Sequence, residues 1–347
     1  MSFRLSRGIS ALSIAATAAT IIVFFISQRH DVSPSQPLPA MRTHCIGRLL
    51  VDLPADIEPA GDVELYYGLG NDFKTVKFES LKEAAAQADL DAAVARRIAQ
   101  LTGDFEDRTP SKNKLAATRK IDERTVLILA HDEPVMQGYF RAEIVFMRGG
   151  TVGRLTQSVF KQDRPEDIEH RLIDIVGHIS PVADADRAGK GTCLGGLLID
   201  AGQDGEVFTL GMRSSLHQDL TIDISLNSLI AEDDGGLLQR VDGKATLLAS
   251  LGVTSHTLRR GKASLSQRPA EELIDSAKDH GKAVRLFDIE TTLAKPSSIA
   301  APQIHLHMSM GGQVPSGDYV DASLPEGDSL ALWDSIVRSV RVRPGAT

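Results

Sequence analysis

The sequence has little cysteine, few aromatic residues and no excess of basic charge. Two cysteines in 347 residues are too few for a disulfide-stapled mini-fold or a four-cysteine zinc site. Aromatic residues make up 5%, with one tryptophan, so a stacking platform for single-stranded nucleic acid is not expected. The formal net charge of −8, without a basic stripe, argues against any nucleic-acid partner. Apolar residues make up 42%, which is enough for a globular core.

Catalytic signatures are also missing. The sequence contains no G-x-S-x-G elbow, no H-E-x-x-H and no C-x-x-C. Gly189–Thr192 and Gly261–Ser264 each contain a glycine–lysine pair, but neither has the upstream glycine of a phosphate-binding loop. We therefore expect no nucleotide or other cofactor, and the sequence shows no recognisable active site.

The longest apolar run is Gly8–Ser27, twenty residues without a formal charge. As a helix it would rise about 30 Å, enough to cross the hydrocarbon core of a bilayer. Arg4 and Arg7 precede it, so the positive-inside rule keeps the N-terminus cytoplasmic and exports the rest of the chain. Residues 1–30 are thus predicted to be a cytoplasmic stub and an uncleaved signal-anchor in the inner membrane. The alternative is a cleavable signal peptide, but the bulkiest apolar residues follow the small residues where cleavage would occur.

The rest of the chain contains a weak internal repeat. The octapeptides Cys45–Asp52 and Cys193–Asp200 are identical at five of eight positions, and each is followed by a similar Gly-x-Val sequence. Three prolines precede the first octapeptide closely, which is typical of an extended stalk. The predicted organisation is a stalk at 31–42, an N-terminal domain at 43–182, a linker at 183–191 and a C-terminal domain at 192–347.

Hydrophobic periodicity predicts strands and helices in a similar order in both halves. Strands are expected at 46–52, 62–68, 73–79, 114–120, 124–131, 138–147 and 152–160, then at 194–199, 206–212, 219–226, 253–260, 262–267, 283–290 and 303–310. Helices are expected at 81–101, from Pro165, at 236–250 and from Ser329. The predicted fold class is α+β: two similar tandem domains after a transmembrane helix, each a largely antiparallel sheet with helices on one face.

Cys45 and Cys193 occupy the same position of the repeated octapeptide. One interpretation is a pair of small buried hydrophobic side chains, each opening a core strand. The other is a disulfide that ties the two halves together, which an exported compartment permits. The sequence supports the two interpretations equally.

Two polar clusters are candidate functional residues. His305 and His307 alternate with apolar residues, so both should lie on one face of a strand, roughly 7 Å apart. No third ligand is indicated, so a solvated sheet face is favoured over a metal site. Glu232, Asp233 and Asp234 lack the ligand spacing of a calcium loop and are a candidate contact for a basic partner.

Several segments together resemble one known family. His44–Pro54, after a membrane segment and stalk, is similar to the beginning of a family of immunity proteins. These proteins neutralise phospholipase effectors of the bacterial type VI secretion system, specifically the fourth lipase-effector family. Leu332–Gly345 resembles the end of that family, and Phe287–Glu290 with the strand ending in Met310–Gly312 resembles another part. Asp288 and Ile289 stand where the family would have an aromatic residue before the glutamate.

The resemblance implies a protein that is not an enzyme. Its expected partners are a cognate phospholipase effector and, through the N-terminal helix, the inner membrane, with no small-molecule substrate. In this family two α+β domains arranged like a claw grip the lid region of the effector and hold its active site shut. Two alternatives from other classes stay open. One is a membrane-anchored envelope enzyme that uses His305, His307 and a carboxylate, and the other is a structural cell-envelope module.

Overall fold

The computed structural model describes residues 37–346, except 58–59, 70–72, 104–113, 132–139, 160–162, 186–187, 231–234, 243–254 and 295–296. The predicted signal-anchor Gly8–Ser27 and the acidic trio Glu232, Asp233 and Asp234 therefore lie outside the described residues. No helix within the described ranges is long and apolar enough to cross a membrane.

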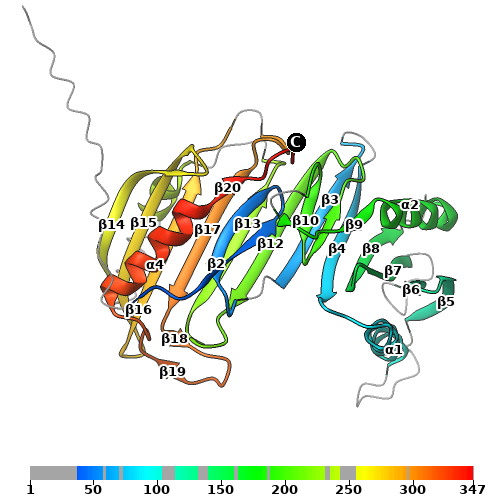
Figure 1. Cartoon of the computed structure of the whole chain (residues 1–347), viewed down its shortest axis with the longest axis horizontal. Helices are drawn as coiled ribbons and strands as arrows, with labels where there is room; N and C mark the ends of the chain where they lie inside the picture. The colour runs from blue at the N-terminus through cyan, green and yellow to red at the C-terminus, as the bar shows by residue number, and fades with distance from the viewer. Residues whose placement is uncertain are drawn as a thin grey trace, which may run out of the picture. The chain divides into compact units, whose positions relative to one another are not determined.

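The main sheet is antiparallel and has twelve strands, to which the described parts of both halves contribute (Figure 1). In sheet order these are β14 (Ser255–Leu265), β15 (Arg268–Asp279), β16 (Lys282–Thr291), β17 (Gln303–Met310), β13 (Thr221–Asn227), β12 (Gly205–Arg213), β3 (Ala60–Tyr67), β4 (Lys74–Lys82), β8 (Thr151–Val159), β7 (Phe140–Arg148), β6 (Thr125–His131) and β5 (Leu115–Asp122).

The two halves of the chain meet where β12 pairs with β3. From this junction the first half runs β3-β4-β8-β7-β6-β5, and the second half runs β12-β13-β17-β16-β15-β14. In both halves the first two strands lie next to the junction and the other four follow in reverse order. Because the strands of both halves form one continuous sheet, the division into two separate domains stays a prediction.

Helices cover both faces of the first half of the sheet, which differs from the predicted single covered face. Helix α1 (Gln87–Thr102) packs Leu90 and Leu101 against Val145 and Met147, which point to one side of β7. Helix α2 (Pro165–Gly177) packs against the other side, together with Ile144 and Phe146. The continuous apolar run in β7 is typical of a strand that is buried on both faces.

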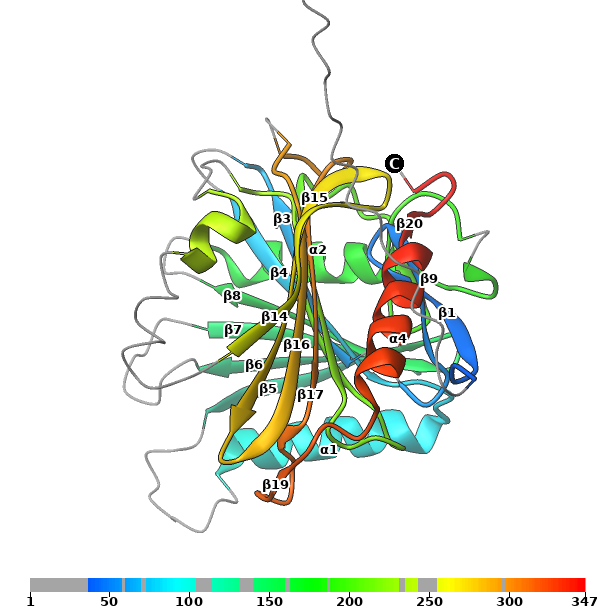
Figure 2. The same cartoon turned by 90° about the vertical axis from the view of Figure 1, so that its left-hand side faces the viewer.

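The second half is covered on one face by helix α4 (Glu326–Ser339). Trp333 is fully buried in this layer, donates a hydrogen bond to Glu272 over 2.8 Å and lies 5.5 Å from the ring of Phe287. A short helical segment at 237–242 lies on the opposite side of the sheet from α4 (Figure 2). The sheet therefore has a side covered by α2 and α4 and a side to which α1 and this segment belong.

Two small three-stranded sheets also lie on the α4 side (Figures 1 and 2). The strands of the first are β1 (Met41–Ile46), β2 (Leu49–Pro54) and β20 (Arg341–Val342), and those of the second are β10 (Thr192–Leu194), β11 (Leu197–Ile199) and β9 (Ile179–Pro181). A two-stranded sheet of β18 (Gly312–Gln313) and β19 (Tyr319–Val320) completes the elements. Strands β1 and β2 form a first hairpin, which pairs with β20 from the end of the second half. Strands β10 and β11 form a second hairpin, which pairs with β9 from the end of the first half. Each hairpin therefore pairs with the closing strand of the other half of the chain.

These hairpins correct the prediction of single strands at 46–52 and 194–199. The chain turns at Gly47 and at Gly195, whose φ angles of 59° and 57° lie in the left-handed region that favours glycine. A Cβ at Gly47 would lie 2.6 Å from Leu226, so the turn also packs closely on the main sheet. Strand β1 begins at Met41, within the last residues of the predicted stalk.

Three further elements differ from the prediction. Helix α1 begins at Gln87 rather than 81, because β4 extends to Lys82 and the Asp89 carboxylate accepts a hydrogen bond from the Ala86 amide. Strand β14 is continuous where two strands were expected. Strand β15 was not expected, because its sequence is rich in charged residues and alanine and shows no clean alternation.

Gly153 and Gly177 offer a matched test of the packing. A Cβ at Gly153 would lie 2.6 Å from Phe146 and 3.0 Å from Phe78, whose rings stack against each other, whereas a Cβ at Gly177 meets nothing within 4 Å. We expect Gly153→Ala to lower the free energy of unfolding by about 1–3 kcal/mol through overpacking. Gly177→Ala should raise it by about 0.5–1 kcal/mol, because alanine favours the helix. Urea unfolding of both variants measures this, and shifts of the same sign would contradict it.

Candidate functional site

The side of the main sheet opposite α4 carries a continuous polar row. Cross-strand pairing places each member beside the next on the same face. From β16 to β8 the row consists of Asp288 and Glu290, His305 and His307, Asp223 and Ser225, Thr209 and Gly211, Asp62 and Glu64, Lys77 and Glu79, and finally Arg154. We call these residues the polar face.

The polar face results from strict alternation in the central strands. In β12 and β13, the residues that point away from it are buried in the core, among them Phe208, Leu210 and Ile224. Thr209 and Asp223 are exposed, and no described side chain covers them. The centre of the sheet is therefore open to solvent on one side over the described part of the chain.

Charged contacts fix the elements that bound the polar face. On the α1 side, Arg97 donates to both carboxylate oxygens of Glu143, which is 1% exposed on β7. The Glu143 side chain holds the pKa of Arg97 above its ordinary value. On the same face of the sheet but in the second half, the short helical segment at 237–242 is held in a similar way. Arg240 donates to both oxygens of Glu290 over 2.8 Å, and the Leu238 amide donates to Glu271.

Ion pairs also run across the strands of the polar face. The Lys77 ammonium lies 2.8 Å from Asp62, and this carboxylate raises the pKa of Lys77. Arg154 donates two hydrogen bonds to one oxygen of Glu79, at 2.6 and 2.8 Å. The side chain of Asp223 is exposed, and its charge acts on the neighbouring His307.

His305 and His307 lie on one face of β17, as predicted from their spacing, and both contact Asp288. Nε2 of His305 and Nδ1 of His307 lie 3.1 and 2.9 Å from the same carboxylate oxygen. Burial raises the pKa of Asp288, but the two histidine contacts outweigh it and bring the pKa to about 2. Burial lowers the pKa of His307, but Asp288 and Asp223 outweigh it and raise this pKa above its ordinary value.

The two histidines and Asp288 form a hydrogen-bonded cluster. No group of three or more potential ligands that could hold a metal ion occurs among the described residues. In the sequence, Asp288 stood out only as a departure from the family pattern, and neither it nor Asp223 or Asp62 was identified as a functional residue. The alternation in TIDISLN and GDVELYY indicated a polar side of each strand, but the sequence did not show that these sides would line up.

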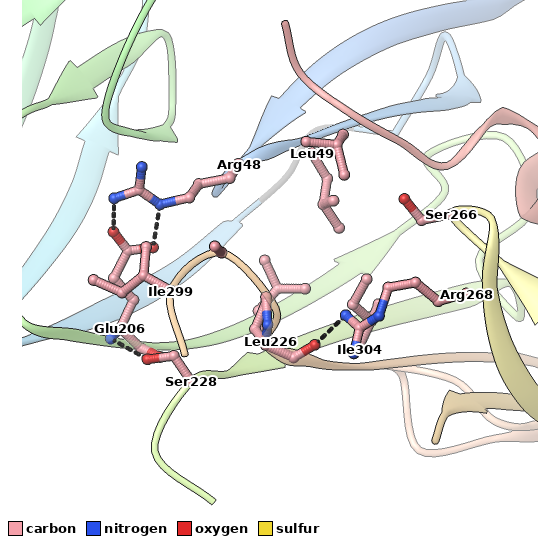
Figure 3. Close-up of a pocket in the computed structure, with 12 residues that line it drawn as sticks. Arg48, Leu49, Glu206, Leu226, Ser228, Ser266, Arg268, Ile299 and Ile304 are labelled. Carbon is pink, nitrogen blue, oxygen red and sulfur yellow. Dashed lines mark hydrogen bonds and ion pairs between the residues drawn. The ribbon is translucent and has the colours of Figure 1, made fainter. Parts of the chain in front are cut away.

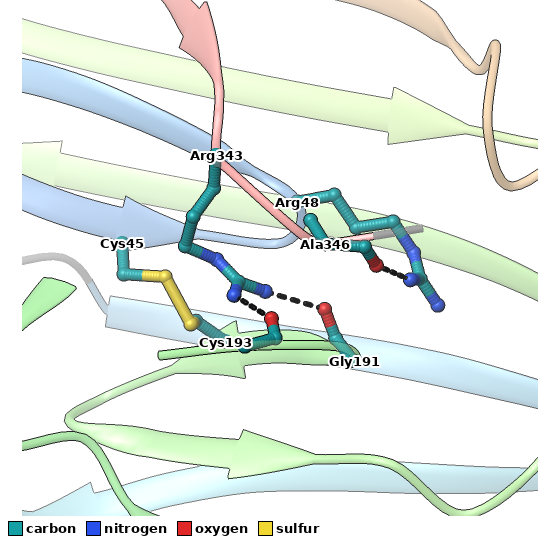
Figure 4. Close-up of a disulfide and its surroundings, with 7 residues drawn as sticks. Cys45, Arg48, Gly191, Cys193, Arg343 and Ala346 are labelled. Carbon is teal, nitrogen blue, oxygen red and sulfur yellow. Dashed lines mark hydrogen bonds between the residues drawn. A yellow bond between two sulfur atoms is a disulfide. The ribbon is translucent and has the colours of Figure 1, made fainter. Parts of the chain in front are cut away.

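Cys45 and Cys193 form a disulfide with their Cα atoms 5.6 Å apart (Figure 4). The amide of Gly47 donates to the carbonyl of Cys193, and the amide of Cys193 donates back to Gly47, both over 2.8 Å. The two hairpins are therefore joined by a covalent bond and a pair of backbone hydrogen bonds. Of the two interpretations that the sequence left open, the structure has the disulfide.

A small apolar cavity lies beside the first hairpin (Figure 3). Arg48 and Glu206 are at one end, and Ser266 and Arg268 are at the other. Its volume of about 30 Å³ is that of one water molecule, so no substrate fits there.

Comparison with known families identifies the second half of the chain. Residues 188–345 match the family described as the C-terminal domain of Tle cognate immunity protein 4. In this part the chain is similar to the Tle cognate immunity protein 4 family. This confirms the resemblance to that immunity-protein family, to which Leu332–Gly345 in the matched range contributed, and an immunity protein is consistent with the prediction that the chain is not an enzyme.

Solved structures show that the likeness in fold extends beyond residues 188–345. The apo immunity protein TplEi of the type VI secretion system of Pseudomonas aeruginosa is similar, with 23% identity and a TM-score of 0.61. A chain of the Tle4–Tli4 complex has 22% identity and a TM-score of 0.62. TplEi bound to a peptide named "L" has 22% identity and a TM-score of 0.57. Each likeness covers 88% of this chain and 98% of the other. A search of curated proteins found no match.

The histidine–aspartate cluster predicts a stability optimum in mildly acidic solution. The lowered pKa of Asp288 contributes stability above its ordinary pKa of 3.8, and this is lost as the pH falls toward about 2. The raised pKa of His307 contributes stability below 6.5, and this is lost as the pH rises through the raised value. Asp288→Asn should remove both effects.

Urea unfolding of the wild type and Asp288→Asn at several pH values tests this. The wild type should be more stable by about 2 kcal/mol near pH 5, and the difference should shrink as the pH falls toward about 2 and as it rises through the raised pKa of His307. A difference that does not change with pH would show that the cluster does not titrate as described.

Proposed function

We propose that this protein binds a cognate phospholipase effector of the type VI secretion system and blocks lipid hydrolysis in the periplasm. The match of residues 188–345 to the immunity-protein family carries this proposal. The Tle4–Tli4 complex supports it, because a chain of that complex has a similar fold. Inhibition is steric: the bound immunity protein prevents the lid of the effector from opening, and substrate access needs that opening.

The proposed location is the inner membrane, with the globular part in the periplasm. The basis is the uncharged run Gly8–Ser27 behind two arginines. A tether would keep the inhibitor beside the bilayer that an incoming lipase attacks, which raises its effective concentration there.

We further propose that the polar face is the surface that contacts the effector. It is the open side of the central strands, whereas α4 and the two small sheets cover the other side of the second half and the junction. Its carboxylates Asp62, Glu64 and Asp223 fit an effector surface that carries basic side chains. A stable complex buries roughly 1,600 Å² over both partners. We expect α1 and the 237–242 segment, which lie on the same side of the sheet (Figure 2), to contribute to the contact.

Co-expression tests the function. A lipase-like effector encoded beside this gene is directed to the periplasm, with and without the full-length protein. We expect lysis and phospholipid breakdown without the protein, and survival with it. Continued lysis in the presence of a folded, exported protein would exclude that effector as the partner. Failure against every neighbouring lipase would exclude the immunity function.

A pair of charge reversals tests the polar face. Asp223→Lys changes an exposed carboxylate at its centre, and Asp174→Lys changes an exposed carboxylate on α2, outside the polar face. We expect Asp223→Lys to weaken effector binding about tenfold or more, mainly through repulsion of basic effector side chains, and Asp174→Lys to leave it unchanged. Surface plasmon resonance at two salt concentrations measures both. Equal affinities of the two variants would place the effector contact elsewhere.

A further inference from the structure

The end of the chain closes the junction between the two halves. Strand β20 pairs with β2, so residues near the C-terminus complete a sheet that residues near the N-terminus began. The Arg343 amide donates to the Arg48 carbonyl over 2.9 Å, and the Gly191 amide donates to the Ala346 carbonyl over 3.3 Å. Residues 341–346 therefore contact both hairpins, and we call them the C-terminal latch.

Two buried guanidinium groups hold the C-terminal latch in place (Figure 4). Arg343 is 1% exposed and donates to the carbonyls of Gly189 and Gly191, the latter over 2.6 Å. Arg48 is 9% exposed, forms a bidentate pair with Glu206 and donates to the Ala346 carbonyl. The hydrogen bond from Arg48 to Ala346 joins residues that are 298 positions apart.

The C-terminal latch depends on the hairpins being held side by side. Arg343 is satisfied by backbone carbonyls of the segment leading into β10, and no described carboxylate pairs with it directly. Its Nε has no hydrogen-bond partner among the described residues, and burial together with the nearby Arg48 lowers the pKa of Arg343. A buried cation held this way is stable only while its carbonyls stay in position.

The disulfide ties the segment that carries those carbonyls to the first hairpin. It joins Cys45 on β1 to Cys193 on β10, two residues after Gly191, and it bridges 148 positions of the chain. Without it, the two hairpins are joined directly by two backbone hydrogen bonds between Gly47 and Cys193. Such short pairings open locally at a low free-energy cost compared with unfolding of the whole protein.

We propose that the Cys45–Cys193 disulfide is a redox switch that closes the C-terminal latch, so that the chain becomes competent to bind its effector only after oxidation. Two thiols lose two protons and two electrons to a protein disulfide, which becomes a dithiol as the new S–S bond forms. A reducing cytoplasm keeps the switch open, and an oxidising compartment closes it. The effect on binding rests on the proposed function, whereas opening of the C-terminal latch does not.

Hydrogen–deuterium exchange of the full chain in detergent micelles tests the latch without any effector. The oxidised wild type is compared with the same protein reduced by a dithiol and with Cys45→Ala/Cys193→Ala. In both samples that lack the disulfide, the reduced wild type and the double alanine variant, we expect hydrogen–deuterium exchange at residues 341–346 to become at least about tenfold faster. Fluorescence of Trp333, the only tryptophan, should stay native because its core layer does not depend on the latch.

Two results would overturn the switch. Unchanged protection of residues 341–346 after reduction would mean that the latch stays closed without the disulfide. Loss of native Trp333 fluorescence in the reduced samples would mean that the disulfide supports the whole fold rather than the latch.

Arg343→Met provides the complementary variant, because it keeps the disulfide and removes the buried cation. We expect fast exchange at residues 341–346 with an intact disulfide and native Trp333 fluorescence. Effector binding should fall about tenfold, as in the reduced protein. Normal binding by a variant with an open latch would show that competence does not require the latch. Failure of the oxidised wild type to bind, with the exchange results as expected, would defeat the proposed function and leave the latch in place.

Discussion

The antiparallel pairing of β12 with β3 is the interaction on which the rest of the structure depends. It turns two six-stranded units into one hydrogen-bonded sheet, and its register places Thr209 beside Asp62. Because paired residues share a face, the same register aligns the polar sides of both halves and, behind them, the apolar sides. The turn at Gly47 packs against Phe208 and Leu226 on the apolar side of the sheet. The first hairpin therefore covers the apolar face next to the β12–β3 pairing.

Strands with clean alternation could be predicted from the sequence, and so could the polar side of each. The expected strand at 303–310 has the bounds of β17, and the pair His305 and His307 lies on one face as their spacing indicated. Helix α2 begins at Pro165, where proline fits the first turn. These features follow from local side-chain periodicity, which each segment carries in its own residues.

Features that depend on distant partners could not be predicted. The run from Cys45 to Leu53 is apolar enough for a single buried strand, and only Gly47 marks the turn that divides it. The exchange of closing strands between the halves leaves no local trace, because β9 and β20 have only three and two residues. Whether the cysteines bond depends on that exchange, so the sequence left both interpretations open. The polar face could not be recognised before the β12–β3 register was known.

The exchange of closing strands also constrains the order in which the protein can fold. A chain emerges N-terminus first, yet the β1–β2 hairpin finds its third strand only in β20, at the other end of the chain. The second hairpin, by contrast, meets β9 a few residues earlier in the sequence. The first hairpin must therefore wait, with one edge unpaired, until Arg341 and Val342 have been made. Contacts of such sequence separation slow folding. A chain that stops before Arg341 lacks the strand that finishes the sheet begun at Met41.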